Sequence, residues 1–155
     1  MKRTYYLSLV FSAFALLSYA QDASTIRKKH FNLASGTALS GYDPVAYFSE
    51  KKAVKGKKEF AAMHQGTTYY FSSAANATAF KNNPASYEPQ YGGWCAYAMG
   101  FDGTKVEIDP ATFKIVDGKL YVFYNKFFTN TLKSWNKDEM ALKKKADLNW
   151  QKTYN

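Results

Sequence analysis

The sequence predicts an α+β fold, a small antiparallel β-sheet with two or three helices packed on it. Two pairs of apolar runs are each separated by a two-residue turn signal, Gln65-Gly66 in one pair and Asp117-Gly118 in the other. Glycine supplies the positive backbone angle that such tight turns require. Two further segments open with residues that cap helices, at Ser73 and at Asn136. Hairpins and helices in one chain of 155 residues indicate an α+β domain.

The strand segments are rich in β-branched and aromatic residues. The first hairpin joins Phe60–His64 to Thr67–Phe71, and the second joins Phe113–Val116 to Leu120–Phe123. A further short apolar run, Val45–Phe48, follows an Asp-Pro pair and is predicted to be the first strand. The predicted sheet therefore contains these strands in antiparallel pairs.

Two helices are predicted from their start and stop signals. The first begins after Ser73 and ends by Asn83, because Pro84 disfavours helical geometry in the residue before it. The second begins at Asn136, and Glu139 completes a capping box. The second helix has a narrow apolar stripe at helical spacing, made of Leu142, Ala146 and Trp150.

The N-terminus predicts a secretory signal over residues 1–20. Lys2 and Arg3 precede an apolar stretch over 5–17, and small residues occupy both cleavage-recognition positions of Ser18-Tyr19-Ala20. The mature chain is then expected to begin at Gln21 and to be exported to a periplasmic or extracellular location. Residues 21–35 are polar and lack periodicity, which predicts an arm or linker, and 36–155 form the domain.

Charge and cysteine content limit the partners. The formal net charge of +9 becomes +7 when Lys2 and Arg3 leave with the signal. This excess suggests contact with an anionic envelope surface more than with nucleic acid, since no basic and aromatic RNA-binding motif is present, and a solvated lysine-rich surface is the favoured interpretation. A metal-handling protein is the other partner considered. Cys95 is the single cysteine, so no internal disulfide can form.

Several motifs resemble the YHS domain family in its exported single-domain form. The resemblance extends from about Leu39 to Trp150. It rests on Gly41-Tyr42-Asp43-Pro44-Val45-Ala46-Tyr47-Phe48, on His64-Gln65-Gly66 before Tyr69-Tyr70-Phe71-Ser72-Ser73, on Asn83-Pro84-Ala85-Ser86-Tyr87, and on Tyr91-Gly92-Gly93-Trp94-Cys95-Ala96.

The resemblance implies a metal site that this chain does not keep intact. Metal-handling relatives carry a cysteine after the Asp-Pro-Val and a cysteine pair four residues apart at the start of the following helix. Here those positions are Ala46, Ser72 and Asn76. Neither an alanine, a hydroxyl nor an amide replaces a thiolate for a soft metal. Ser72 and Asn76 are instead expected to hydrogen-bond each other or the start of the helix.

A remaining metal site would have to use Cys95. The other candidate ligands are His64, Met99 and Met63, with Asp43 as an outer partner. Cys95 and Met99 are four residues apart and lie on one face if that segment is helical. A thiolate, a thioether and an imidazole together suit copper in its Cu(I) form. The preferred interpretation is therefore an exported, non-enzymatic YHS-like domain that binds a metal ion, copper above others, through Cys95.

Two other functions remain open. An enzyme would use Cys95 as nucleophile, His64 as base and Asp43 as the orienting carboxylate, although nothing in their spacing demands it. A metal-free domain would instead bind a small molecule or a protein partner through the aromatic surface near Trp94. The candidate ligand-binding residues of that surface are Tyr42, Asp43, Tyr91 and Trp94.

Overall fold

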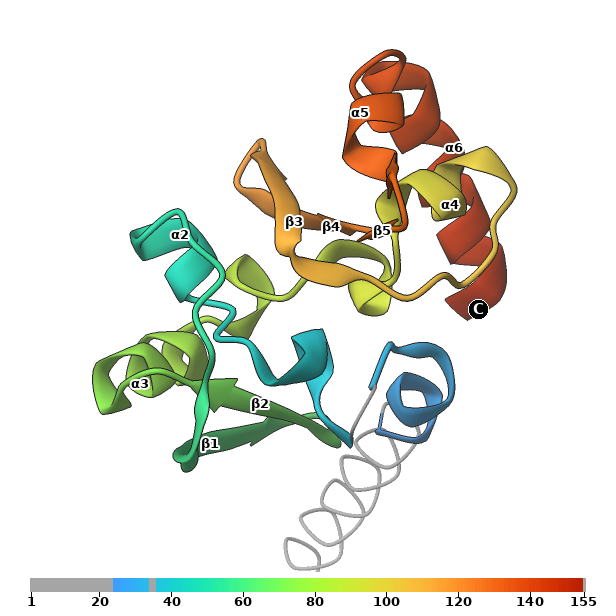
Figure 1. The fold of residues 1–155 in the computed structure, drawn as a ribbon. Coiled ribbons are helices and arrows are strands. Elements are labelled where there is room, and N and C mark those ends of the chain that lie inside the picture. Colours follow the sequence, from blue (N-terminus) through green and yellow to red (C-terminus); the bar gives the residue numbers. More distant parts are fainter. Residues whose placement is uncertain (1–23, 34–35, 155) are drawn as a thin grey trace, which may run out of the picture.

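Two antiparallel hairpins organise the chain, each with helices packed beside it (Figure 1). The computed structural model describes residues 24–33 and 36–154, so the predicted signal sequence lies outside the described residues. One part of the fold contains the first hairpin and the helices next to it in the sequence, and the other contains the second hairpin and the C-terminal helices. The α+β prediction is confirmed.

The first hairpin pairs β1 (Lys57–His64) with β2 (Thr67–Phe71), and His64 faces Thr67 across the turn. Alternate residues of β2 are buried, which is the period-two pattern of a strand with one face on the core. Helix α3 (Ala74–Asn82) follows, and the Ser73 hydroxyl accepts a hydrogen bond from the Asn76 backbone N–H. The predicted hairpin and the predicted cap at Ser73 are both confirmed.

The second hairpin pairs β3 (Asp109–Val116) with β4 (Lys119–Phe123) around the predicted Asp-Gly turn. Three helices accompany it: α4 (Ala96–Phe101), α5 (Thr131–Trp135) and α6 (Glu139–Tyr154). Helix α6 packs closely on α4 because Gly100 has no side chain, and a Cβ there would lie 2.4 Å from the Leu142 carbonyl oxygen. A short third hairpin, β5 (Asn125–Lys126) with β6 (Thr129–Asn130), was not predicted.

Two local predictions are wrong. Residues 45–48 do not form a strand, since α2 (Ala46–Ser49) occupies this segment. The cause is Asp43, whose Oδ1 accepts hydrogen bonds from the backbone N–H groups of Val45 at 2.9 Å and Ala46 at 3.3 Å and so starts a helical turn. Asn136 does not cap α6 either: it is the C-cap of α5, and α6 begins at Glu139.

The predicted N-terminal arm is folded onto the domain where the structure describes it. Residues 24–30 form a helix, and Arg27 on that helix is only 4% exposed. The Arg27 guanidinium forms an ion pair with Glu88 and donates to the Tyr69 hydroxyl at 3.1 Å. Phe31, just beyond the helix, packs against Trp150 of α6. This segment therefore contacts both parts of the fold.

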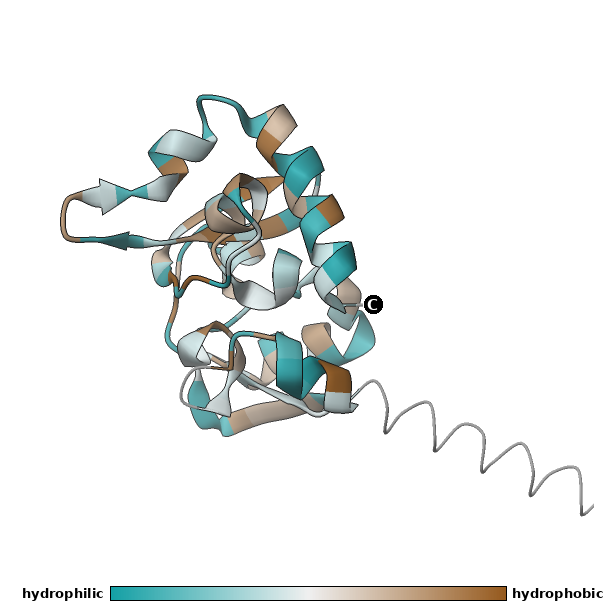
Figure 2. Cartoon of the chain, turned by 90° about the vertical axis from the view of Figure 1, so that its right-hand side faces the viewer, coloured by the Kyte–Doolittle hydropathy of each residue, from teal (hydrophilic) through white to brown (hydrophobic). Residues whose placement is uncertain are grey.

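The buried side chains form three clusters. One lies between β1, β2 and α3 and includes Tyr69, Phe71 and Phe80. A second lies around Cys95 and β4, and a third joins α4, α6 and β4 around Trp135. Figure 2 shows alternating hydrophilic and hydrophobic bands along α6, whose buried residues include Leu142 and Ala146. Among the described residues, no helix has both the length and the apolar content needed to cross a membrane.

Candidate functional site

The carboxylate of Asp43 is fully buried and organises one end of the fold. Its Oδ2 accepts hydrogen bonds from the Ser72 backbone N–H, the Ser72 hydroxyl and the Asn76 side-chain amide, each at 2.7 Å. The Asn76 amide also donates to the Ser72 hydroxyl at 3.2 Å. The predicted hydrogen bond between Ser72 and Asn76 is confirmed, with Asp43 as the shared acceptor.

This network occupies the place implied for a metal. Ala46, Ser72 and Asn76 stand where metal-handling relatives carry cysteines, and all three donate to the Asp43 carboxylate, Ala46 through its backbone and the other two through their side chains. With five donors, that carboxylate is close to saturated as an acceptor. The residues present do not fit a soft-metal site at this position.

Cys95 lies at the start of α4 and is completely buried. Its Sγ accepts a hydrogen bond from the Tyr124 backbone N–H at 3.3 Å and lies 3.3 Å from the Thr131 Oγ1. Met99 is also buried, one helical turn further along, and its backbone N–H bonds to the Cys95 carbonyl. The thiol therefore sits among apolar side chains and hydroxyl and amide partners, as a structural buried cysteine does.

The remaining predicted ligands lie on the first hairpin. Met63 is 74% exposed on β1, and the His64 ring packs edge-on against Phe80 in the first core cluster. Cys95 belongs to a different cluster, so the structure does not bring these side chains together around one centre. Within residues 24–33 and 36–154, no group of three or more His, Cys, Asp and Glu side chains could hold a metal ion.

The same geometry bears on the catalytic alternative. A nucleophile, a base and an orienting carboxylate need hydrogen bonds in series. The Asp43 carboxylate bonds to Ser72 and Asn76, and the Cys95 thiol contacts Thr131 and Tyr124. Neither of these contacts involves His64, so a Cys-His-Asp relay is not assembled.

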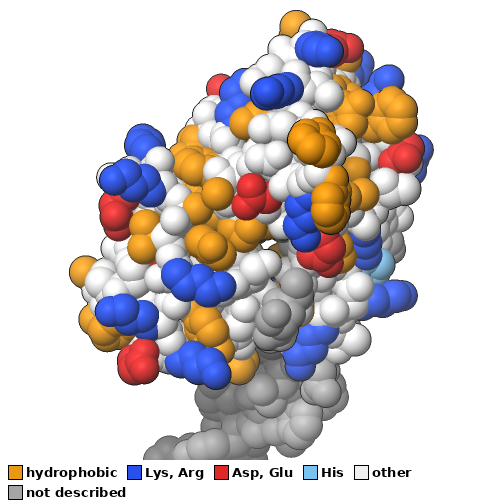
Figure 3. Space-filling model, viewed as in Figure 1, with side chains coloured by type: hydrophobic (Ala, Val, Ile, Leu, Met, Phe, Trp, Pro, Cys, Tyr) orange, Lys and Arg blue, Asp and Glu red, His pale blue; other side chains and the backbone are white. Residues whose placement is uncertain are grey.

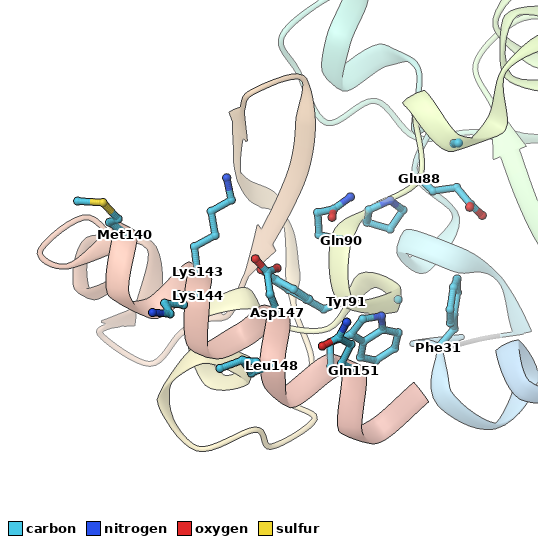
Figure 4. Close-up of a pocket in the computed structure, with 14 residues that line it drawn as sticks. Phe31, Glu88, Gln90, Tyr91, Met140, Lys143, Lys144, Asp147, Leu148 and Gln151 are labelled. Atoms are coloured by element: carbon cyan, nitrogen blue, oxygen red, sulfur yellow. The ribbon is translucent and has the colours of Figure 1, made fainter. Parts of the chain in front are cut away.

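A cavity of about 580 Å³ lies between α6 and the segment that carries Tyr91 (Figure 4). Figure 4 shows α6 side chains on one side, and Glu88, Gln90, Tyr91 and Phe31 toward the other. A volume of this size falls in the range of small-molecule sites, about 300 to 1,000 Å³. The lining residues are Phe31, Ala85, Glu88, Pro89, Gln90, Tyr91, Gly92, Met140, Lys143, Lys144, Asp147, Leu148, Trp150 and Gln151.

The aromatic wall of the cavity depends on a glycine that lets two rings approach the backbone closely. Gly92 lies in the one-turn 3-10 helix η4 (Gln90–Gly93) with φ +60°. A Cβ at this position would lie 2.8 Å from both the Phe31 and Trp150 rings, so a side chain would push the two rings apart. These rings lie 6.0 Å apart between centroids. The glycine pair noted in the sequence thus lets the N-terminal segment and α6 meet at the cavity.

Polar groups stand beside this wall. The Tyr91 hydroxyl donates to the Asp147 carboxylate at 2.9 Å, and burial together with Asp147 raises the pKa of Tyr91 far above its usual value. Lys143 pairs with Asp117, and this hydrogen bond raises the pKa of Lys143. Glu88 at the other end is held by Arg27. The cavity therefore offers a hydrogen-bonding pair, cationic side chains and apolar faces together.

The predicted ligand-binding residues are only partly gathered here. Tyr91 lines the cavity, but the Trp94 indole donates to the His30 carbonyl at 2.6 Å and is not part of the lining. Tyr42 lies under the Lys55 ammonium, 4.6 Å from its ring centroid, and Asp43 is buried in its own network. The sequence did not indicate the α6 residues of the lining, because charged residues such as Lys144 and Asp147 lie outside the apolar stripe of that helix.

Comparison with known families gives a match in the part of the chain that contains the first hairpin and α3. Residues 45–91 match the model of the YHS domain family. The match supports a YHS domain in this part of the chain and covers α2, the first hairpin, α3 and the turn that reaches Tyr91. No curated protein and no solved structure matches the chain.

Proposed function

We propose that this protein is an exported, non-enzymatic domain that binds a small organic molecule in the cavity between Tyr91 and α6. The observation that carries the proposal is the cavity of about 580 Å³, whose walls combine the Phe31, Tyr91 and Trp150 rings with a few polar groups. Ligand sites are mostly apolar, with a small number of polar groups that fix orientation. This arrangement favours the metal-free function over copper binding through Cys95.

The walls suggest the chemistry of the ligand. The partly exposed Phe31 and Trp150 rings suit a flat apolar body, which stacks on ring faces or edges, whereas Tyr91 is only 4% exposed. Lys144 is exposed at the rim, and no ion pair to it is present among the described residues, whereas Lys143 pairs with Asp117 and Asp147 accepts from Tyr91. A flat ligand with one anionic group would therefore find an apolar face and an available cation.

The test is a fluorescence titration with 8-anilinonaphthalene-1-sulfonate, a flat aromatic anion. We expect saturable one-to-one binding that weakens at least tenfold in Leu148→Asp, because Leu148 is 50% exposed and lines the cavity. Met63→Asp is the matched control: it also replaces an exposed apolar side chain by aspartate, but it lies on β1 and should bind as wild type. Equal binding in both variants would overturn the proposal.

The rim cation and export need separate measurements. Lys144→Glu should weaken the same probe more than Lys81→Glu, an equal change of charge on α3. Circular dichroism of each variant establishes that the native fold is kept.

Export is tested by measuring the intact mass of the protein recovered outside the cytoplasm. This mass should correspond to a chain that begins at Gln21. A mass that includes residues 1–20 would contradict the predicted signal.

A further inference from the structure

Two phenylalanines form the tip of the third hairpin. Phe127 and Phe128 connect β5 to β6 and are 87% and 111% exposed. Figure 2 shows this hairpin projecting from the body of the protein, with hydrophobic colour at its tip. Neither ring contacts another aromatic ring among the described residues, and neither belongs to the three core clusters described above. The tip is thus an exposed apolar element that does not stabilise the fold by burial.

The backbone makes this choice of residues unfavourable. Phe127 and Phe128 have φ +48° and +68°. These values lie in the left-handed region, which residues other than Gly, Asn and Asp avoid. The two long hairpins described above turn with the same signs of φ but place glycine second, at Gly66 and Gly118. An Asn-Gly pair is preferred in such turns. Folding alone would therefore not select two phenylalanines here.

The segment that carries the tip has more lysines than acidic residues. From Asn125 to Lys137 the chain contains Lys126, Lys133 and Lys137, and Asp138 and Glu139 follow directly, with Glu139 in an ion pair with Lys114. These three lysines are exposed on β5, on α5 and just beyond α5. On the face of the molecule shown in Figure 3, cationic and anionic side chains are interspersed over both parts of the fold. An exposed apolar tip with exposed lysines on the same segment is typical of surfaces that bind anionic lipid.

We infer that the Phe127-Phe128 turn inserts into the interfacial region of an anionic lipid bilayer, with the neighbouring lysines against the head groups. Phenylalanine gains from leaving water for the acyl boundary, and lysines near an anionic surface add electrostatic attraction. A protein pocket fits the flanking residues less well, because lysine is depleted at the cores of protein interfaces. The inference uses a surface separate from the cavity and extends the proposed function.

The test is vesicle flotation of the mature protein with vesicles of phosphatidylcholine that contain about 30% phosphatidylglycerol, a moderately anionic surface. The informative variant is Phe127→Asn with Phe128→Gly, which installs the preferred turn and should unfold at an equal or higher temperature. We expect it to lose at least tenfold in vesicle partitioning. A gain in stability together with a loss of binding would not arise from misfolding.

Controls separate the two contributions. Phe101→Asn removes another exposed phenylalanine, 66% exposed on α4, and should partition as wild type. Lys126→Glu with Lys133→Glu should remove most binding and its dependence on salt, and neutral vesicles should bind weakly. Absence of wild-type binding to the anionic vesicles, or equal binding of the turn variant, would overturn the inference. The inference would also be overturned if the turn variant no longer bound a protein partner of the wild type but still bound the vesicles as the wild type does.

This experiment is independent of the ligand cavity. Leu148→Asp, which tests the cavity, should leave vesicle partitioning unchanged, and the turn variant should leave the saturable cavity titration unchanged. Failure of one proposal is therefore distinguishable from failure of the other. A turn variant that lost both properties would contradict their assignment to separate surfaces.

Discussion

Asp43 and Asn76 lie 33 positions apart in the sequence, and a 2.7 Å hydrogen bond joins the Asn76 amide to the Asp43 carboxylate. The bond connects the loop before α2 with the first turn of α3. Together with the bonds from Ser72, it places one buried negative charge where the resemblance implied a cluster of thiolates. Structural hydrogen bonds therefore occupy the position at which the resemblance implied metal ligands.

Removal of this carboxylate should destabilise the protein strongly. Asp43→Ala leaves the buried donors of Ser72 and Asn76 and the start of α2 without acceptors, and we expect a loss of about 3 kcal/mol or more in the free energy of unfolding. Urea denaturation followed by circular dichroism measures it. Asp102→Ala, which removes a fully exposed carboxylate bonded only to nearby Thr104, is the control and should change little. Similar midpoints for both variants would contradict a structural role for Asp43.

Reinstating the thiols should create a metal site. The triple variant Ala46→Cys, Ser72→Cys and Asn76→Cys puts three thiolates around the Asp43 carboxylate, and a fourth oxygen ligand completes the tetrahedral set that zinc prefers. We expect one-to-one Zn²⁺ binding in competition with a chromogenic chelator. Ala74→Cys with Thr78→Cys, a pair with the same spacing on the exposed side of α3, should compete poorly. If the triple variant bound no better than this pair, these positions would not surround a common centre.

Cys95 should be chemically silent in the folded state. The side chain is completely buried, and its sulfur is engaged by Tyr124 and Thr131. Reaction with a chromogenic disulfide reagent should proceed only on unfolding, with a rate that rises with denaturant. In a Cu(I) competition titration, wild type and Cys95→Ser should be indistinguishable. Tight binding that is lost in Cys95→Ser would instead restore the copper function.

The Arg27–Glu88 ion pair should contribute more than a surface pair. Its side chains are 5% and 17% exposed, so Arg27→Met leaves a largely buried carboxylate without its cation. Loss of one partner of a buried pair costs about 3 to 5 kcal/mol. Lys143→Met is the matched control, because Asp117 is 73% exposed, and it should cost below about 1 kcal/mol. Thermal and urea unfolding measure both, and equal losses would contradict the difference in burial.

Stability should fall as the pH falls below 6.5. Burial lowers the pKa of His64 below its usual 6.5, and Arg27 lowers it further although Glu88 opposes this shift. Burial, Lys105 and Lys29 lower the pKa of His30 in the same sense. At pH values between the folded and unfolded pKa of each histidine, the unfolded chain therefore binds more protons than the folded chain. The contribution of the histidines to the free energy of unfolding is complete above pH 6.5 and is lost as the pH falls through the folded pKa. His64→Gln should flatten urea midpoints measured from pH 7 to 5, and an unchanged slope would contradict its role.

The sequence predicted the elements whose signals are local. Both long hairpins and the Ser73 cap follow from turn and capping residues that act over a few positions. The segment over 45–48 was mistaken for a strand because the helix there depends on Asp43, whose position is fixed by long-range bonds to Ser72 and Asn76. Asn136 was assigned to the wrong helix end because the short helix α5, which it terminates, has no strong periodicity of its own.

The cavity was less predictable than the fold. The glycine pair and Tyr91 were recognised in the sequence, but their partner surface lies on α6, more than 50 positions further along, and no local pattern links the two. Phe31 lies in a segment that the sequence predicted to be an arm or linker. Its position depends on the contact with Trp150 and on the buried Arg27 of the preceding helix, and neither can be read from local sequence.

The family match ends at Tyr91, which is also the first residue in the sequence that belongs to the third core cluster. The two long hairpins share no sheet among the described strands, so their joining does not depend on a continuous ladder of backbone bonds. The two parts are joined instead by side chains, because the cluster around Cys95 also contains Leu39 and Tyr47, and the Tyr47 ring packs against Phe113 of β3. A large-to-small substitution in this cluster is therefore expected to loosen both parts of the fold at once.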